Sequence, residues 1–382
     1  GTGMTAHSFD NAAPGSVQKG RPFWRGLKPT GASFAEVATL WTTLAILVVL
    51  VLYPLGMLLL RSFQNEELTA YTLENYSEIL QTPQLVRTLT NSMVIAAGTT
   101  LFAVVVGVSL AWINARTDTP GSRTLTNLNL IPFFTPPFVG AFAWTVLASK
   151  NSGMLNSWYF GLTGATDPLF NIYSPAGIIF VLGLHDAPIV YLFVAGAFRK
   201  MDPSLEEAAR MAGSGPLGTT WNVTLPLTVP AILSAAMLIF VTTLGAFEIP
   251  LVLGLPARYT VLTTELFAVI SEYPARYNLA AAMCSVLLSF TAIGVLLQRK
   301  VIMRRSYVTV TGKAYQPRRM AIGWGRPIAL GWNLFYLFVS VALPTFALVI
   351  ISLERVWTGS IRIEEFTLEN YHYIFNDFSM GW

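Results

Sequence analysis

Seven long apolar stretches limit what this chain can fold into. An α-helix rises about 1.5 Å per residue, so about 20 mostly apolar residues are needed to cross a hydrocarbon core of about 30 Å. The stretches that reach this length are Val37–Leu60, Asn91–Asn114, Leu128–Ser149, Pro175–Phe198, Leu227–Gly254, Asn278–Leu297 and Pro327–Leu353. Charged residues make up only 12% of the chain, about half the share usual in soluble proteins, and the stretches lack the two-residue alternation of a membrane barrel. The sequence therefore predicts an all-α polytopic membrane protein.

Prolines and ionisable residues interrupt three of these stretches. The third carries prolines at positions 132, 136 and 137, so we expect it to be kinked or broken. The fourth contains His185 and Asp186, and the fifth contains Glu248 near its end. Because ionisable groups are costly inside a bilayer, these three side chains are candidates for a translocation pathway.

Each of these ionisable groups has two interpretations. Glu248 lines a cation's route or an outer gate, or it pairs with Arg258 or faces headgroup water. His185 and Asp186 form a proton relay, or they line the central seam of the bundle and satisfy helix backbone near Pro188. We favour the second interpretation for the His185 and Asp186 pair, since irregular backbone at membrane depth needs polar partners.

Basic residues indicate the orientation of the chain. Seventeen of the 24 Lys and Arg residues fall in the N-terminal tail and in the loops on its side of the predicted bundle. The positive-inside rule therefore predicts a cytoplasmic N-terminus. Residues 298–326 hold eight of these charges, which could bind nucleic acid or anionic lipid, but we favour a cytoplasmic connection between two membrane units and expect no nucleic acid partner.

A short repeat suggests an internal duplication. Tyr71-Thr-Leu-Glu-Asn-Tyr76 returns as Phe366-Thr-Leu-Glu-Asn-Tyr371 at an offset of 295, whereas the preceding apolar stretches correspond at an offset of 290. The second copy therefore has five extra residues in its loop. We expect the chain to be a fragment of a longer, tandemly duplicated protein, with one complete unit and the first helix of a second. The expected divisions are a mobile cytoplasmic tail (1–36), the first transmembrane unit (37–300), a basic cytoplasmic linker (301–326) and the truncated start of the second unit (327–382).

The loop between the fourth and fifth stretches has explicit helix signals. Asp202 suits an N-cap and Pro203 the first helical position. Gly213 suits a left-handed residue that ends this helix, and Pro216 can begin a second short helix. We expect this second helix to run until Leu225-Pro226 turns the chain back into the membrane. A helix, a glycine turn and a helix outside the bilayer form a rigid protrusion that can enter a groove on another protein.

The loop also contains a spaced motif. Three residues separate its Glu-Ala-Ala run from the glycine, nine separate the glycine from an aliphatic residue, and one separates that residue from Leu-Pro. The positions are Glu207, Ala208, Ala209, Gly213, Val223, Leu225 and Pro226. This pattern resembles the EAA signature of ATP-binding-cassette (ABC) importer permeases, with Val223 where isoleucine is commoner.

The resemblance implies a type I ABC importer permease bundle. In that family the loop forms coupling helices that sit in a cleft of the nucleotide-binding subunit. Glu207 would cap or pair within this dock, Ala208 and Ala209 would permit close approach, and Gly213 would provide the turn. Partners implied by the resemblance are a cytoplasmic ABC ATPase dimer, which binds ATP and Mg, a periplasmic or lipid-anchored substrate-binding protein, and the bilayer of the bacterial inner membrane.

Other segments resemble the ferric-iron group of these permeases, in which two permease halves are commonly fused. They are Pro203–Ala209, Leu225–Ala231, Phe247–Pro256 and Val261–Glu265. The resemblance implies a permease for ferric iron. Phosphonate, thiamine, sulfate and polyamine permeases are close relatives, so another small solute stays open.

The sequence predicts a transport component and not an enzyme. No Ser/His/Asp triad or metal-ligand cluster with usable spacing occurs in the sequence. The run from Gly213 to Thr220 looks like a phosphate-binding loop, but Thr219 stands where the lysine is required, so we expect no catalytic, cofactor or metal site on this chain. The competing classes are a proton-coupled secondary transporter that uses His185, Asp186 and Glu248, and a membrane scaffold without transport activity.

Overall fold

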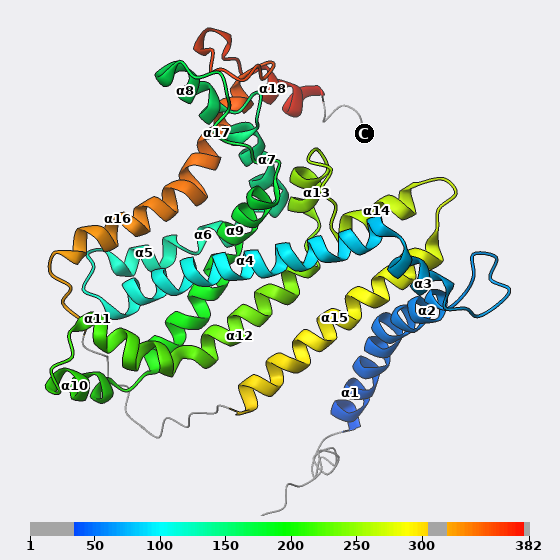
Figure 1. The fold of residues 1–382 in the computed structure, drawn as a ribbon, viewed down its shortest axis with the longest axis horizontal. Coiled ribbons are helices and arrows are strands. Elements are labelled where there is room, and N and C mark those ends of the chain that lie inside the picture. The colour runs from blue at the N-terminus through cyan, green and yellow to red at the C-terminus, as the bar shows by residue number, and fades with distance from the viewer. Residues whose placement is uncertain (1–33, 305–318, 378–382) are drawn as a thin grey trace, which may run out of the picture. The chain divides into compact units, whose positions relative to one another are not determined.

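The computed structural model describes residues 34–304 and 319–377, and it is built of helices (Figure 1). Within these ranges no strand forms, and only three isolated bridges link extended residues. The all-α prediction is therefore confirmed. The chain divides into two compact units, Gly1–Met57 and Leu58–Trp382.

The helices of the two units follow in chain order. The first unit contains α1 (Phe34–Leu47), the π-helical turn η2 (Val48–Leu52) and the start of α2 (Tyr53–Ser62). After the end of α2, the second unit contains α3 (Glu74–Gln81), α4 (Pro83–Arg116), α5 (Ser122–Leu128), α6 (Ile131–Phe134), α7 (Pro137–Ala148), α8 (Met154–Thr163), α9 (Pro175–Lys200), α10 (Pro203–Met211), α11 (Pro216–Thr219), η3 (Thr220–Thr224), α12 (Leu225–Leu244), α13 (Glu248–Gly254), α14 (Leu262–Ser271), α15 (Tyr277–Arg304), α16 (Gly325–Leu337), η4 (Phe338–Ala342), α17 (Leu343–Leu353), η5 (Ile363–Glu365), α18 (Glu369–His372) and η6 (Tyr373–Asp377).

Membrane-length helices account for the predicted spans. In the described residues, six helices are long and apolar enough to cross a membrane. The remaining predicted span corresponds to two helical segments, Ser122–Phe134 and Pro137–Ala148, which meet at 92°, the geometry of a broken span or of a re-entrant loop. This break lies at Pro136, inside the proline-rich stretch that the sequence predicts to be kinked or broken. The predicted tail lies almost entirely outside the described residues, as does linker segment 305–318.

The fifth span is shorter than predicted. Instead of continuing to Gly254, α12 ends at Leu244, where Gly245 closes the last turn by donating its N–H to the Thr242 carbonyl at 3.1 Å. The chain then starts a separate helix, α13, with Glu248 in its first turn. The fifth stretch is therefore interrupted near Glu248, as expected, but the interruption falls at Gly245, because the glycine ends the helix before the apolar composition changes.

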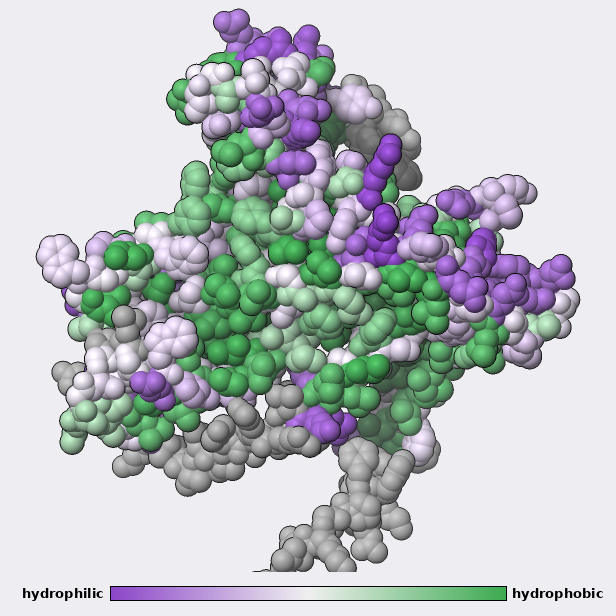
Figure 2. All heavy atoms as spheres, viewed as in Figure 1, coloured by the Kyte–Doolittle hydropathy of each residue, from purple (hydrophilic) through white to green (hydrophobic). Residues whose placement is uncertain are grey.

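The core of the second unit is the close packing of α4 against α9. Gly107 makes this approach possible, since a Cβ there would lie 2.7 Å from both the Ala187 carbonyl oxygen and the Val190 Cβ. Buried side chains from α7, α12 and α13 extend the same cluster. Over the second unit, Figure 2 shows apolar side chains covering the long helices, with hydrophilic side chains gathered near α3 and α18. This distribution suits a protein whose apolar belt lies in the bilayer and whose hydrophilic ends lie in water.

The last span, α16–η4–α17, packs against the bundle and is fixed there by polar contacts. Asn333 accepts hydrogen bonds from Asn114 Nδ2 at 2.9 Å and from Asn129 Nδ2 at 2.8 Å. The Tyr336 hydroxyl donates to the Leu184 carbonyl at 3.1 Å. That carbonyl lacks its helical partner, because the residue four positions on is Pro188, which has no N–H. Such contacts hold helices together where lipid offers no hydrophobic drive.

The two copies of the short repeat fold alike. Asn75 Nδ2 donates to the carbonyls of Ser62 and Gln64 at 3.1 and 2.8 Å. In the second copy, Asn370 Nδ2 donates to the Ser352 and Glu354 carbonyls at 3.1 and 2.9 Å. Each copy also joins a tyrosine hydroxyl to the same serine, Tyr76 to Ser62 and Tyr371 to Ser352. The matching contacts span five more residues in the second copy, which agrees with the insertion predicted from the sequence.

Candidate functional site

The loop helix α10 begins and ends as its sequence predicts. The Asp202 side chain caps α10 by accepting from the Ser204 backbone N–H at 2.9 Å. This hydrogen bond lowers the pKa of the Asp202 carboxyl below its ordinary value. At the other end, Gly213 has φ of +87°, and the Ser214 N–H closes the turn on the Ala209 carbonyl at 3.0 Å. The predicted cap and the predicted left-handed glycine are both confirmed.

Two neighbouring glutamates of α10 point to different sides of the helix. Glu206 is buried, forms an ion pair with Arg116 at the end of α4, and accepts from Thr224 Oγ1 at 2.7 Å. Glu207 and Ala208 are exposed, and Ala209 is half-buried. The resemblance implies that Glu207 caps or pairs within the dock on a partner subunit, whereas the ion pair within the chain is formed by Glu206. Successive helical residues lie about 100° apart, so one glutamate anchors α10 while the other stays available outside.

Arg116 connects the loop to both long helices of the core. Its side chain is 1% exposed, and its Nη1 donates to the Phe198 carbonyl near the end of α9 at 3.3 Å. Its ion pair with Glu206 connects it to α10, and the hydrogen bond from Thr224 to Glu206 extends this connection to η3. Arg116 and Glu206 therefore connect α10 to the ends of α4 and α9.

The second part of the loop differs from its prediction. Helix α11 does start at Pro216, but η3 and α12 follow it without an interruption. Leu225-Pro226 therefore does not turn the chain, and the prediction of a turn there was wrong. The π-helical register of η3 precedes Pro226, with the Leu225 N–H bonded to the Thr220 carbonyl, so the helix continues although Pro226 lacks a donor. Val223 and Leu225 are half-buried and Pro226 is exposed.

The described end of the basic linker is tied to the loop that follows α4. Arg326 Nε donates to Asp118 Oδ2 at 2.9 Å, and Arg319 donates to the Ser122 hydroxyl. Met320 pairs with Thr117 in a parallel bridge. The guanidinium of Arg326 lowers the pKa of the Asp118 carboxyl. Arg319 and Arg326 of the linker therefore hold it against the loop after α4, on the side of the bundle predicted to be cytoplasmic.

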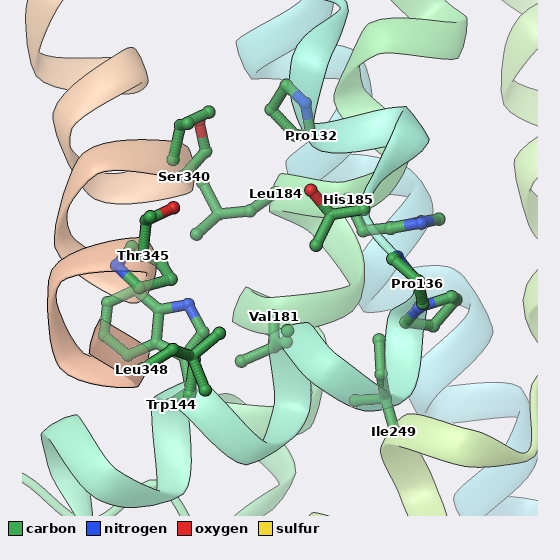
Figure 3. Close-up of a pocket in the computed structure, with 16 residues that line it drawn as sticks. Pro132, Pro136, Trp144, Val181, Leu184, His185, Ile249, Ser340, Thr345 and Leu348 are labelled. Atoms are coloured by element: carbon green, nitrogen blue, oxygen red, sulfur yellow. The ribbon is translucent and has the colours of Figure 1, made fainter. Parts of the chain in front are cut away.

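A small seam, lined mostly by prolines and other apolar residues with a few polar side chains among them, lies at the break at Pro136. Its cavity of about 60 Å³ is lined by the prolines of the break, by α9, by α13 and by the last span. Figure 3 shows His185 beside Pro136, with Ser340 and Thr345 on the facing helix. Non-helical backbone at membrane depth is costly where it faces lipid, but it is tolerated where it lines a cavity. The interrupted backbone at these prolines lines such a cavity, which suits a translocation route. No group of three or more His, Cys, Asp or Glu side chains gathers as metal ligands in the described parts of the chain.

The three predicted pathway residues do not share one environment. His185 Nδ1 lies 3.0 Å from Asp186 Oδ1; His185 lines the seam and Asp186 is buried. Glu248 is exposed at the start of α13, next to the lining residue Ile249. Among the described residues it has no ion pair with Arg258. We predicted that His185 and Asp186 satisfy helix backbone near Pro188. Helix α9 is instead continuous through Pro188, and the Leu184 carbonyl accepts its hydrogen bond from Tyr336.

Sequence reasoning missed the residues that hold the site together. Neither Arg116 nor Glu206 was singled out from the sequence. One available signal was the period of α10, which cannot place Glu206 and Glu207 on the same face. The role of Tyr336 had no such signal, because its partner carbonyl lies 152 residues away.

The fold and the anchored loop helix define a helical protein with several membrane-length helices and a helix presented outside the bundle. A family model describes the larger part of the chain, residues 103–306, as a binding-protein-dependent transport system inner membrane component. The chain belongs to this family, so it is a multi-span inner-membrane transport component, as the EAA resemblance implied. Members of the family serve as permeases, which agrees with the prediction that the chain is not an enzyme.

Named relatives include two ferric transport permeases. The chain is 27% identical over 280 residues to the ferric transport system permease protein FbpB of Actinobacillus pleuropneumoniae, covering 73% of this chain and 40% of the relative. It is 26% identical over 280 residues to a putative ferric transport permease of Haemophilus influenzae, covering 73% and 43%. The chain thus spans about two fifths of these relatives. The spermidine/putrescine permease PotB of Escherichia coli is 27% identical over 184 residues, covering 48% and 66%.

Solved structures show the same fold. A chain of a bacterial ABC transporter involved in the import of the acidic polysaccharide alginate superposes with a TM-score of 0.62 at 19% identity. The superposition covers 74% of this chain and 99% of that chain. The predicted importer-permease bundle is therefore the observed fold.

Proposed function

We propose that the chain is the permease of an ATP-driven, binding-protein-dependent importer of ferric iron. In this proposal residues 37–300 form one permease unit, residues 327–382 begin a second, and the N-terminus is cytoplasmic. A cytoplasmic ABC ATPase dimer binds ATP and Mg, and a binding protein delivers the substrate on the other side. The family supports this function over a proton-coupled transporter or a scaffold, since its members work with binding proteins.

The observation that carries the proposal is the two-faced helix α10. Its exposed side offers Glu207 and Ala208 to a partner, while its buried side is locked through Glu206 to Arg116. The stiffer the anchor of a docking helix, the larger the share of the partner's movement that reaches the bundle. When ATP closes the ATPase dimer, α10 moves with it and Arg116 moves the ends of α4 and α9. Different contacts of α10 with open and closed ATPase are the required coupling free energy.

The seam at the broken span is the proposed translocation route. At the interrupted helix, the seam brings together the imidazole of His185 and the hydroxyl groups of Ser340 and Thr345. Glu248, exposed one residue before the lining Ile249, would supply a negative charge at the outer entrance. The polar side chains in this otherwise apolar seam are the groups that would contact a hydrated or ligated cation.

Replacing His185 by Leu tests the route. We expect uptake to fall about tenfold, which corresponds to about 1.4 kcal/mol of lost polar interaction. The conservative His185→Gln should retain most of the uptake, because its amide still offers a polar group to the seam and to Asp186. His372→Leu is the matched control, since His372 is exposed outside the seam and should not matter. Equal uptake in His185→Leu and His372→Leu, with equal melting temperatures, would remove His185 from the route.

Ferric iron is the proposed cargo because two ferric transport permeases are among the relatives. The similarity to the spermidine/putrescine permease PotB favours a polyamine as the second candidate. Both cargoes are cations, so the polar side chains that line the seam do not separate them. A direct comparison of uptake is therefore needed.

Radiolabelled uptake by cells that express the natural gene with its neighbours tests both levels of the proposal. We expect accumulation of iron that stops when ATP is depleted, and co-purification of an ATPase with the chain. Accumulation of spermidine instead of iron would change the cargo but keep the importer. Iron uptake driven by a proton gradient, without an associated ATPase, would contradict the proposed function.

A further inference from the structure

A wide apolar groove lies between the end of α4 and the start of α16. Its volume is about 1080 Å³, and Gly215 and Gly218 at the start of α11 form another wall. The turn that precedes α16, residues 321–325, completes the lining. Figure 1 shows α11 beside the start of α16 at one end of the bundle. The groove shares no lining residue with the seam of the proposed route, so the proposed function leaves it without an occupant.

The lining of the groove offers few polar groups to a ligand. Three of its side chains are indoles, and among the described lining residues only Ser109 carries a hydroxyl group and none is charged. Trp112 Nε1 donates to Thr220 Oγ1 at 3.1 Å, and Trp332 Nε1 donates to Ser109 Oγ at 2.9 Å. These two N–H groups are therefore used within the chain, and the indole rings present apolar surface to the groove. An alkyl chain is the ligand chemistry that this lining fits.

The groove opens where a bilayer would meet water. Two of its side chains are strongly exposed, Trp324 at 94% and Ile328 at 75%. Trp112 lies near the end of α4 and Trp332 near the start of α16, and both helices belong to membrane-length spans. Tryptophan rings concentrate at the headgroup level of a bilayer. Lipid is therefore the surrounding medium from which the groove would take an occupant.

Arginines border the groove at its turn. The turn runs from Arg319 and its neighbour Met320 to Arg326, and both arginines are exposed. Arg319 donates to the hydroxyl of Ser122, whose next residue in the chain is the exposed Arg123. Arg326 pairs with the Asp118 carboxylate. Three guanidinium groups thus accompany one paired carboxylate beside the groove.

The charge of the whole linker has the same sign. Residues 298–326 hold eight lysines and arginines and no aspartate or glutamate. Basic residues beside membrane helices attract anionic lipid headgroups, and basic pockets between such helices bind them specifically. A phosphate beside these arginines would place its acyl chains at the apolar groove. The charge and the lining are therefore complementary to the two ends of one kind of molecule.

We propose that the groove binds an anionic phospholipid of the cytoplasmic leaflet. An acyl chain lies against Trp112, Ile328 and Trp332, and the phosphate lies beside Arg319 and Arg326. The proposed function supplies only the orientation, which decides the leaflet that provides the lipid. A neutral lipid lacks the charge that the arginines complement, and inorganic phosphate lacks the apolar part that fits the groove.

A lipid at this position would connect three parts of the unit. It touches the end of α4, the start of the last span and the two glycines at α11. Helix α11 leads directly into η3, which Trp112 already ties to α4 through Thr220. A ligand that binds only the folded arrangement stabilises it by mass action. Anionic lipid therefore holds the second part of the loop against α4, and the melting temperature of the transporter rises with its fraction in the bilayer.

A photoreactive lipid tests the proposal. The natural transporter is reconstituted in phosphatidylcholine vesicles that contain an increasing fraction of phosphatidylglycerol with a diazirine in its acyl chain. After illumination, the lipid adducts are mapped by mass spectrometry. We expect adducts that saturate on residues 109–113 and 321–332. Phosphatidylcholine with the same diazirine, at the same fraction, should give several-fold fewer adducts there.

Charge variants test the position of the headgroup. Arg319→Gln and Arg326→Gln should each raise the phosphatidylglycerol fraction at half-maximal labelling about fivefold, the contribution of one cation near an anionic surface. Arg355→Gln is the matched control, because Arg355 also forms an exposed ion pair but lies at the other end of the last span. It should leave the half-maximal fraction unchanged.

An apolar variant tests the position of the acyl chain without removing an ion pair. Ile328→Ser should lower labelling of the groove several-fold. Leu334→Ser is its control, because Leu334 is an exposed residue of the same helix that does not line the groove. This comparison keeps the proposal testable even where an arginine variant fails to fold.

Equal labelling by the two diazirine lipids would overturn the proposal, because the groove would then hold bulk lipid only. Half-maximal fractions that stay unchanged in both arginine variants would overturn it too, as would equal labelling of Ile328→Ser and Leu334→Ser. The readout needs no cargo, ATP or ATPase. A failure of iron uptake or of ATPase association, with the labelling as expected, would therefore count against the proposed function and not against the lipid site.

Discussion

Replacing Glu206 by Ala is expected to lower the free energy of unfolding by about 3–5 kcal/mol, the cost of removing one partner of a buried ion pair. The side chains of Arg116 and Glu206 are 1% and 4% exposed, so water cannot replace the lost carboxylate. Thr224 loses its acceptor in the same variant. We expect a lower melting temperature of the purified protein and loss of uptake, since α10 is no longer anchored to α4.

Glu207→Ala is the matched control for this prediction. Glu207 is exposed, so its loss should change the free energy of unfolding by no more than about 0.5 kcal/mol. Uptake should nevertheless fall, because the proposed contact with the ATPase is weakened. Two adjacent glutamates would then separate an anchoring role from a docking role. Equal effects of the two substitutions on melting temperature would contradict this division.

The double variant Arg116→Met, Glu206→Leu separates stability from transmission. Replacing a buried ion pair by apolar residues of similar size is often neutral or stabilising. We expect the melting temperature to recover and uptake to stay low, because the apolar pair loses the hydrogen bonds to Phe198 and Thr224. Full recovery of uptake would show that any packed contact at this point is sufficient.

Local signals predicted local structure well in this protein. The cap at Asp202, the left-handed Gly213 and the break among the prolines depend on residues within one or two turns of each other. The repeat was also visible, since it needs only a comparison of the chain with itself. Its shared hydrogen bonds, from Asn75 and from Asn370, were then found in the structure.

Contacts between distant segments could not be predicted from the same signals. Arg116 and Glu206 lie 90 positions apart, and neither residue's neighbours indicate the other. Apolar composition continued past Gly245, so hydropathy alone extended the fifth span to Gly254. At Leu225-Pro226 the proline suggested a turn, but a π-helical register absorbed the missing donor. In each case a tertiary or register effect outweighed a local preference.

Replacing Gly213 by Val is expected to uncouple ATP hydrolysis from uptake while the bundle stays folded. Its φ of +87° is a conformation in which a β-branched residue is strained by at least about 1–2 kcal/mol. No heavy atom lies within 4 Å of a Cβ built there, so the strain comes from the backbone and not from a clash. The turn between α10 and α11 should open, which changes how α10 is presented without touching α4 or α9.

Gly215→Val is the matched control for the Gly213 variant. Gly215 also has open space around a built Cβ, but it is absent from the described positive-φ glycines. We expect Gly213→Val to keep most of the ATPase activity of the assembled transporter, with uptake reduced several-fold, and Gly215→Val to keep both. The measurements are the ratio of substrate imported to ATP hydrolysed in vesicles and the melting temperature of each variant. An unchanged ratio in Gly213→Val would show that the turn at Gly213 does not position the coupling helix.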